Sequence, residues 1–455
     1  MPRVKSNLVC VALVIALQTQ IAQAQGDLLD ADGIAEAIVS MTSRVWTGPR
    51  TPAPDPVARP RNASQSMGSP YALLRVHADP GVSRRSMRQA LSALDHARGR
   101  LDAMGWPWPI PDGDLGGGPD LDLYLSTALP PGAYSDGMAI WSYFDRASTF
   151  AVLGPATPEG KLDACATAAY VDALLLSIDP GEARNWRRAT AAWLTWELTG
   201  ELGCDEALSR QQAEPYRSWV AGAAGDGAGG ALLLSYLSAR HDAVPGQFVR
   251  DVWGLASQRT WEGVGLRADP DLWSAIESAV DRSGDRLVNN IEELAVLRWF
   301  VGRGDRADAV VASLDRDAKV PISRKIKRLP TRLVASQPLA TFGSAYLIMD
   351  ASTWGDERRL RAWLKGEYGV HWSFVALQLD GRGNEIRRIA APHSGTTPSA
   401  YLPIELDDAT QRLLFVVTNL ANGLPDADEP DVSERAFELI VDRVDPGPQS
   451  KRSAN

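Results

Sequence analysis

The spacing of hydrophobic residues changes twice along the 455-residue chain, and each change predicts a different kind of structure. Between residues 71 and 157, short runs such as LDLYLS, MAIWSYF and TFAVLG alternate as strands do. Among them, apolar residues recur every three or four positions from Met87 to Leu101, which predicts a helix that Ser83 caps and Gly105 ends. The first part of the chain is therefore expected to form a small sheet with one long helix.

Residues 158–325 have helical spacing, with Gly and Pro at the joins. We expect helices over 161–178, 184–202, 205–222, 228–240, 246–256, 270–282, 288–302 and 305–314. After about Arg328 the period falls to two, and eight short β-runs follow at the spacing of a β-sandwich. The expected fold class is therefore α+β: a mainly helical domain with a small N-terminal sheet, followed by an all-β Ig-like sandwich.

The two ends of the chain differ from the rest in composition. A basic start, an apolar run from Leu8 to Leu17 and the small residues Ala22 and Ala24 are typical of a secretory signal peptide over residues 1–24. That run is too short to cross a bilayer, and no later stretch is long and apolar enough. Residues 25–70 and 447–455 are rich in polar residues and Pro, so we expect both to be flexible. The expected domains are then 71–325 and 326–446.

Charge and cysteine content indicate where the protein works. The net charge of −9 argues against nucleic acid as a partner. With the signal peptide removed, we expect a secreted or periplasmic protein with no transmembrane segment. Two cysteines remain, Cys165 and Cys204, and an even pair in an oxidising compartment predicts one disulfide. The alternative is two buried free thiols.

Several stretches resemble those of exported bacterial metallopeptidase-like proteins of the gluzincin (thermolysin-like) type with a C-terminal Ig-like β-sandwich. In chain order these are DLDLYLS, STFAVLG, ACATAAYVDALLLSID, NWRRATAAWLTWE, AVLRWFVGRGD, FGSAYLIMD and LLFVVTNLA. The resemblance covers about Tyr71 to Asp445. It implies a metallopeptidase-like domain over 71–325, in which a metal-binding helix is followed by a second helix that carries a third ligand.

The residues that such a zinc site needs are missing. The family's first helix carries His-Glu-x-x-His, in which two imidazoles hold zinc and the Glu activates water, and its second helix supplies a Glu ligand. The motif aligns here with Ala168–Asp172 or Ala169–Ala173, neither of which contains His or Glu, and the ligand Glu aligns with Arg188. The five histidines are His77, His96, His241, His371 and His393, none between residues 97 and 240. We therefore expect no catalytic residue of this type, no metal and no cofactor.

The degenerate site is open to more than one interpretation. Asp172 and Arg188 could pair and replace the metal as the link between the two helices. A ligand pocket could form there, lined by Tyr170, Trp193, Trp196 and Glu197. Tryptophans three residues apart on a helix are, however, more typical of core packing. Alternatively the resemblance is accidental, and residues 161–202 form a helical hairpin joined by its two cysteines.

Two further clusters have simpler explanations than a functional site. The loop PDGDLGGGPDLD contains four carboxylates that could bind calcium: Asp112, Asp114, Asp120 and Asp122. It does not match an EF-hand and is typical of a turn-rich loop before a strand. The basic cluster SRKIKRLPTR lies where the helical and β parts join. We expect it to be a solvated linker face, with an acidic partner surface as the alternative.

These observations favour three functions from different classes. The first is a catalytically inactive metallopeptidase-like protein, a pseudopeptidase, that binds or scaffolds an unknown protein or surface ligand. The second is an active hydrolase with a rearranged site, in which Asp172, Glu197 or Glu201 serves as acid or base. The third is a cell-surface adhesion protein or complex subunit that acts through its β-sandwich. The absence of histidine near residues 165–202 favours the first.

Overall fold

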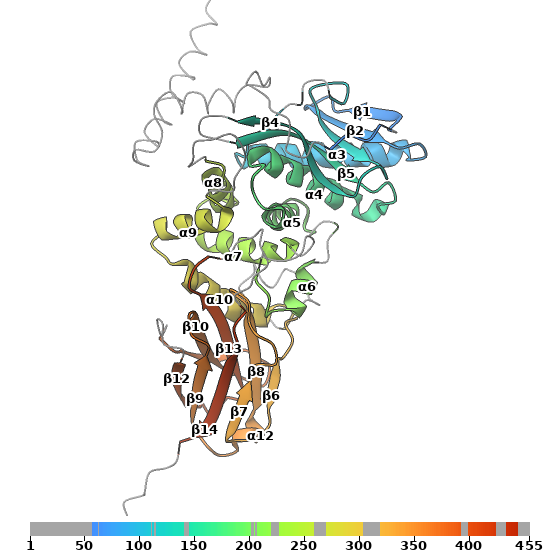
Figure 1. Ribbon diagram of the computed structural model, residues 1–455. Helices are drawn as coiled ribbons and strands as arrows, with labels where there is room; N and C mark the ends of the chain where they lie inside the picture. The colour runs from blue at the N-terminus through green and yellow to red at the C-terminus, as the bar shows by residue number, and fades with distance from the viewer. Residues whose placement is uncertain are drawn as a thin grey trace, which may run out of the picture.

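The computed structural model describes residues 57–61, 63–110, 112, 115–140, 145–201, 204, 207–219, 227–258, 270–303, 319–392, 399–424 and 434–444 (Figure 1). The expected signal peptide, most of the segment expected to be flexible, the helix expected over 305–314 and the C-terminal tail lie outside these ranges. Within them, no helix is long and apolar enough to cross a membrane.

The N-terminal part is a five-stranded mixed sheet with two helices on one face (Figure 1). Its strands are β1 (Gln65–Gly68), β2 (Leu74–Ala78), β3 (Leu121–Leu125), β4 (Gly132–Ile140) and β5 (Asp145–Leu153), in the order β1-β2-β3-β5-β4. The central three run parallel, and both edge strands pair antiparallel. Alternate apolar residues of β2, β3 and β5 pack against α3 (Arg84–Ala103) and α4 (Glu159–Ile178). Ser83 caps α3 as predicted, because the Ser86 N–H donates to its Oγ at 3.0 Å.

Two boundaries differ from those expected from the sequence. Strand β1 lies inside the segment that we expected to be flexible, where it pairs with β2 while Met67 packs against the core. The helix expected over 205–222 is α6 (Ala207–Ala213) and ends much earlier. It stops before Pro215, because the residue that precedes a proline is disfavoured in the helical conformation.

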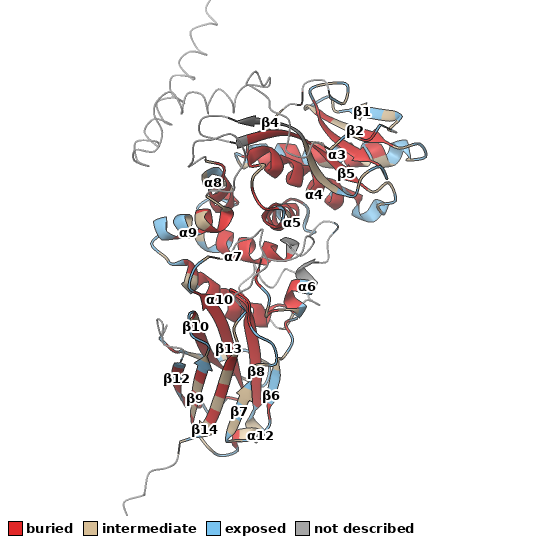
Figure 2. Cartoon of the chain, viewed as in Figure 1, coloured by how far each residue is buried: buried red, intermediate tan, exposed pale blue. Residues whose placement is uncertain are grey.

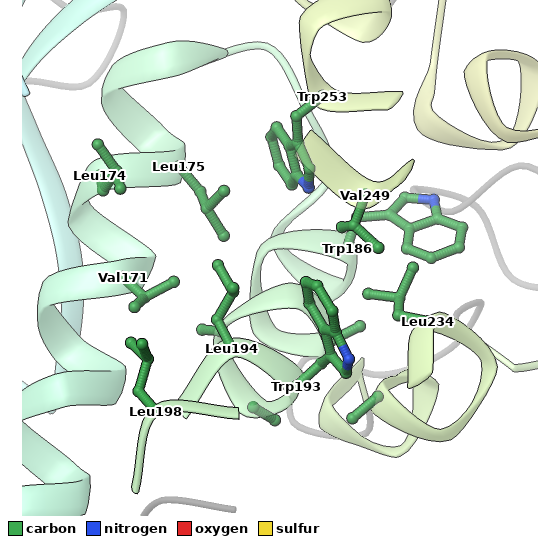
Figure 3. Packing of buried hydrophobic residues seen from close by; sticks show 14 of the residues in the cluster. Val171, Leu174, Leu175, Trp186, Trp193, Leu194, Leu198, Leu234, Val249 and Trp253 are labelled. Atoms are coloured by element: carbon green, nitrogen blue, oxygen red, sulfur yellow. The ribbon is translucent and has the colours of Figure 1, made fainter. Parts of the chain in front are cut away.

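The middle of the chain is helical and lies between the two β parts (Figure 1). It contains α5 (Arg184–Thr199), α6, the 3₁₀ turn η1 (Gly227–Gly230), α7 (Ala231–His241), α8 (Gln247–Ala256), α9 (Leu272–Arg282) and α10 (Leu287–Phe300). Figure 3 shows Trp193 of α5 and Trp253 of α8 packed with aliphatic residues of α4, α5 and α7. The Trp253 indole N–H donates to the Thr190 hydroxyl at 3.0 Å, so this aromatic core also has a directional contact.

The C-terminal part is a β-sandwich of two sheets. Their orders are β11-β10-β13-β8-β6 and β12-β9-β14-β7. The strands are β6 (Arg324–Ile326), β7 (Thr331–Val334), β8 (Ser344–Asp350), β9 (Arg359–Gly366), β10 (His371–Leu379), β11 (Glu385–Ala390), β12 (Ser399–Glu405), β13 (Arg412–Ala421) and β14 (Phe437–Arg443), with the short helix α12 (Ala351–Trp354). Inward residues of both sheets, such as Leu364 and Phe415, form one core.

Helix α10 joins the helical part to the sandwich by covering the outer face of the β8-containing sheet. Trp299 stacks on Tyr346 with ring centroids 5.9 Å apart, and the Tyr346 hydroxyl donates to the Ala295 carbonyl at 2.6 Å. Figure 2 shows the resulting burial on both sides of β8, β10 and β13. The predicted fold class is confirmed: a small N-terminal mixed sheet, a helical middle and a β-rich C-terminal part of two sheets.

Candidate functional site

Helix α4 is buried on nearly all sides (Figure 2). From Ala164 to Ile178 every residue except the half-buried Ala168 is buried, because the helix lies between the sheet and α5. A helix in this position needs apolar residues all round, not in one stripe. Asp172 is the single charged residue of this stretch, and a buried charge requires partners.

Asp172 is held by one cation and one backbone donor. Its Oδ1 accepts from Arg187 Nε of α5 at 3.3 Å, and its Oδ2 accepts from the Ala133 N–H of β4 at 3.2 Å. Arg187 also donates from Nη1 to the Glu182 carbonyl at 2.9 Å. The two side chains are 10 % and 11 % exposed, so water screens the pair only weakly. This ion pair ties α4, α5 and the edge strand together.

The arginine in this pair is the neighbour of the one that we expected. Arg187 is buried and Arg188 is half-buried. Consecutive residues on a helix project about 100° apart, so only one of the two can face α4 fully. Sequence reasoning chose Arg188 by alignment with the family motif. The two arginines are adjacent in the sequence, and only the rotation of α5 against α4 distinguishes them.

The other positions of the degenerate motif belong to the core. Ala169 and Ala173 are buried among apolar neighbours of α3 and α5, and Ala168 is half-buried. Within the described ranges, no group of three or more His, Cys, Asp or Glu side chains could hold a metal ion. The helices expected to carry ligands are present, and their facing side chains are alanine and an ion pair.

The aromatic residues for which either a pocket or core packing was considered are packed in the hydrophobic core. Tyr170 is 0 % exposed and Trp193 is 1 % exposed, and Trp196 is half-buried against the same cluster. Burial raises the pKa of Tyr170 to about 12, although the nearby Arg98 lowers it in part. Glu197 lies at the surface, where partial desolvation and Asp242 raise its pKa. The structure therefore does not bring Glu197 together with Asp172 through any shared partner among the residues described.

The predicted disulfide is confirmed. Cys165 in α4 is bonded to Cys204 just beyond α5, with Cα atoms 5.1 Å apart. The sequence separation of 39 closes a loop that contains α4 from Cys165 onward and all of α5. The hairpin thus has a covalent link near its open end and the Asp172–Arg187 ion pair nearer its turn.

Further charged groups beside the edge strand are compensated internally. Arg146 of β5 is buried, and this desolvation lowers its pKa to about 10 while Asp179 opposes the shift. Desolvation raises the pKa of Tyr134 on β4, and the cationic Arg184 opposes that shift. The region around β4 therefore combines charges of both signs.

The acidic loop does not present a calcium site in the part of it that the structure describes. Asp120 pairs with Arg75 at 2.8 Å, and Asp122 pairs with both Arg59 and His77. Asp112 also pairs with Arg59, at 2.5 Å. Asp114 lies outside the described residues. Arginines therefore occupy carboxylates that we considered as calcium ligands. Arg59 was not expected to take part, because it lies in the segment expected to be flexible.

A cavity of about 370 Å³ lies where the helical part meets the sandwich. Its lining includes Glu214 and Tyr216 after α6, Arg324 of β6, and Val334 at the end of β7. It therefore combines apolar walls with one acidic and one basic side chain. Arg324 belongs to the predicted basic cluster and lies at the rim of this cavity, and the next cations along the chain, Lys325, Lys327 and Arg328, are exposed.

Comparison with known proteins assigns no family. No protein-family model matches the chain, and no curated protein matches it. The pre-peptidase C-terminal domain of collagenase from Bacillus anthracis is similar over 27 % of this chain and 96 % of its own, with 13 % identity and a TM-score of 0.19. The Yersinia pseudotuberculosis-derived mitogen is similar over 27 % and 93 %, with 12 % identity and a TM-score of 0.17.

A family 6 carbohydrate-binding module gives a comparable result, with 11 % identity, coverage of 27 % of this chain and 99 % of that one, and a TM-score of 0.16. Similarities at these TM-scores carry no argument about family or function. The resemblance to gluzincin-type peptidases therefore stays a prediction. The disulfide is consistent with a protein that works outside the cytoplasm.

Proposed function

We propose that this protein is an exported pseudopeptidase, which binds or scaffolds a partner and does not hydrolyse peptide bonds. The observation that carries the proposal is the engagement of Asp172. It is the one charged group at the first-helix motif positions, and Arg187 and the Ala133 N–H occupy its two oxygens. If Asp172 became a metal ligand or a base, the buried Arg187 would lose its counter-charge, which is strongly unfavourable.

The edge strand supports the same proposal. Strand β4 is at the edge of its sheet, and extended peptides bind such edges through backbone donors. The Ala133 N–H donates inward to Asp172 instead. At that position β4 has no backbone donor to offer a peptide substrate.

The test is the zinc content of the purified mature chain, together with casein cleavage with and without a chelator. We expect no stoichiometric zinc and no chelator-sensitive cleavage. One zinc per chain with chelator-sensitive activity would overturn the proposal. A matched variant carries Ala168→His, Ala169→Glu, Asp172→His and Arg188→Glu. Zinc uptake by this variant and not by the parent would support the alignment of the two helices with the peptidase motif.

An active hydrolase with a rearranged site is the second candidate. The observation that favours it is the raised pKa of Glu197, because desolvation and Asp242 favour the protonated carboxyl, which is the form that acts as a general acid. Its neighbour Asp242 accepts the N–H groups of Gly246 and Phe248 and so belongs to the α7–α8 connection. Turnover of chromogenic ester, peptide or glycoside substrates that Glu197→Gln abolishes would establish this function, and no turnover by the parent chain would exclude it for those substrates.

Adhesion through the β-sandwich is the third candidate, and the junction cavity with its exposed basic rim favours it. Exposed cations on an edge strand also prevent edge-to-edge aggregation, so the basic rim has a structural explanation as well. The full-length chain and its variant with Arg324→Glu and Lys325→Glu should be compared on a sulfated polysaccharide column. Salt-sensitive retention of the parent that the variant loses would support this function, and equal elution would contradict it.

A further inference from the structure

The face of the N-terminal sheet opposite α3 and α4 carries a second polar site. Strands β2, β3 and β5 present His77, Asp122, Tyr124 and Phe150 on this face. The segment before β1, residues 57–61 and 63–64, lies against it, and we call this segment the strap. The strap contains neither helix nor strand among its described residues.

Arg59 of the strap inserts its guanidinium into a pocket that matches it chemically. Nη2 lies 2.5 Å from Asp112 Oδ2, Nη1 pairs with Asp122, and Nη1 also donates to the Leu115 carbonyl at 3.1 Å. The guanidinium carbon lies 5.0 Å from the centroid of the Phe150 ring. Both carboxylates are 0 % exposed. Two carboxylates, a carbonyl and an aromatic face satisfy a planar guanidinium better than an ammonium group.

The walls of this pocket belong to the sheet and its loop, not to the strap. His77 Nε2 lies 2.9 Å from Asp122 Oδ1, and the His77 ring stacks on Tyr124 with centroids 4.6 Å apart. The loop backbone at Gly116 passes so close that a Cβ there would lie 1.8 Å from Asp122 Oδ2. These contacts hold Asp122 in place whether or not the guanidinium comes from the strap.

The strap itself is attached through side chains. Besides Arg59, Val57 and Ala63 pack partly buried against Tyr124, Phe150 and Val152. Arg61, two residues from Arg59, is exposed to solvent. Pro60 is buried as well, and Arg59 supplies the charged contacts of the strap with this face.

We propose that this pocket recognises an arginine side chain on an extended polypeptide, that the strap fills it in cis, and that an arginine-bearing segment of a partner can take its place. Two buried carboxylates require a cation in every state of the folded protein, so exchange of one arginine for another leaves the charge balance intact. The proposal concerns a different face from the α4–α5 site and holds whether or not that site hydrolyses a substrate.

The test uses the full mature chain and a fluorescent peptide with the strap sequence VARPRNAS. Arg59→Ala empties the pocket, and the matched control Arg61→Ala leaves it filled. We expect the peptide to bind the Arg59→Ala chain at least about tenfold more tightly than the parent or the control, whose own strap competes. The same peptide with Arg59→Lys should bind the Arg59→Ala chain at least about tenfold more weakly than the unchanged peptide does. Equal binding by all three chains, or of both peptides, would overturn the proposal.

A second measurement needs no variant and covers the case in which Arg59→Ala does not fold. The amide hydrogen exchange rate of residues 57–64 in the parent chain is measured in the presence of N-acetylarginine amide and, separately, of N-acetyllysine amide. The ionic strength is the same in both samples. We expect exchange to rise with the arginine compound only, because it competes with Arg59 for the pocket. The same exchange rate with both compounds would overturn the proposal.

Discussion

The Asp172–Arg187 pair is the contact whose removal tests most directly how the α4–α5 hairpin is held. We consider Asp172→Asn, which removes the charge and keeps an acceptor for the Ala133 N–H, and Arg187→Met, which keeps an apolar stem of similar length. Two unit charges 3.3 Å apart interact with about 5 kcal/mol at an effective dielectric constant of about 20. Desolvation offsets part of this, and loss of one partner of a buried pair typically costs about 3–5 kcal/mol.

We therefore expect each single variant to lower the free energy of unfolding by about 3 kcal/mol. The double variant leaves no uncompensated charge and should cost about the same as either single one, which corresponds to a coupling energy of about 3 kcal/mol. Urea unfolding followed by far-UV circular dichroism gives these values. Arg188→Met is the matched control, with an expected cost below about 1 kcal/mol because Arg188 is half-buried and outside the pair. A coupling energy below about 0.5 kcal/mol, or an equal effect of Arg188→Met, would refute the reasoning.

Three further predictions test other parts of the fold. Replacing Cys165 and Cys204 by serine opens a loop with a separation of 39 residues and should lower unfolding free energy by about 4 kcal/mol; no change in urea midpoint would contradict this. The Cβ of Gly254→Ala in α8 meets no neighbour within 4 Å, so this variant should stabilise the fold by about 0.5–1 kcal/mol in the same assay. Gly366→Ala would place Cβ 2.2 Å from the Trp372 ring nitrogen and should destabilise the fold by about 1–3 kcal/mol. The hydrogen bond from the Arg286 backbone N–H is the main cause that lowers the pKa of Asp285 from 3.8 to about 2. The ionised carboxylate therefore stabilises the folded protein fully above about pH 4, and this stabilisation is lost towards pH 2. Asp285→Asn should accordingly lower the melting temperature at pH 6 and leave it unchanged at pH 2.

Local patterns were sufficient for the fold class and for most elements, although β1 was not predicted and the helix after residue 205 was predicted too long. The alternation in LDLYLS predicts β3, and the spacing from Met87 to Leu101 with Ser83 before it predicts α3 and its cap. Each of these patterns depends only on residues close together in the sequence. Successive side chains of a strand point to opposite faces, and side chains three or four residues apart on a helix lie on the same face. The disulfide was predictable for a different reason, because the two cysteines left in a chain that is expected to be exported have only one way to pair.

The composition of α4 also indicated that its expected chemistry is absent. No arrangement in space can create His-Glu-x-x-His in a helix that reads ATAAYVDALLL. The ion pair that stands at this position could not be predicted from the sequence. Asp172 had two consecutive arginines available, and the rotation of α5 against α4, set by the packing of Trp186 and Trp193, decided that Arg187 faces it.

The arginine pocket shows most clearly what the sequence determines and what only the tertiary structure decides. The sequence alone determined that Asp122 and Tyr124 lie on one face of the strand LDLYLS, opposite its leucines. Only the tertiary structure decided that the cation beside Asp122 comes from Arg59, which is 63 residues away in a segment with the composition of a linker. Periodicity reports on neighbours along the chain, whereas a buried charge is satisfied by whichever residue the completed fold brings near it.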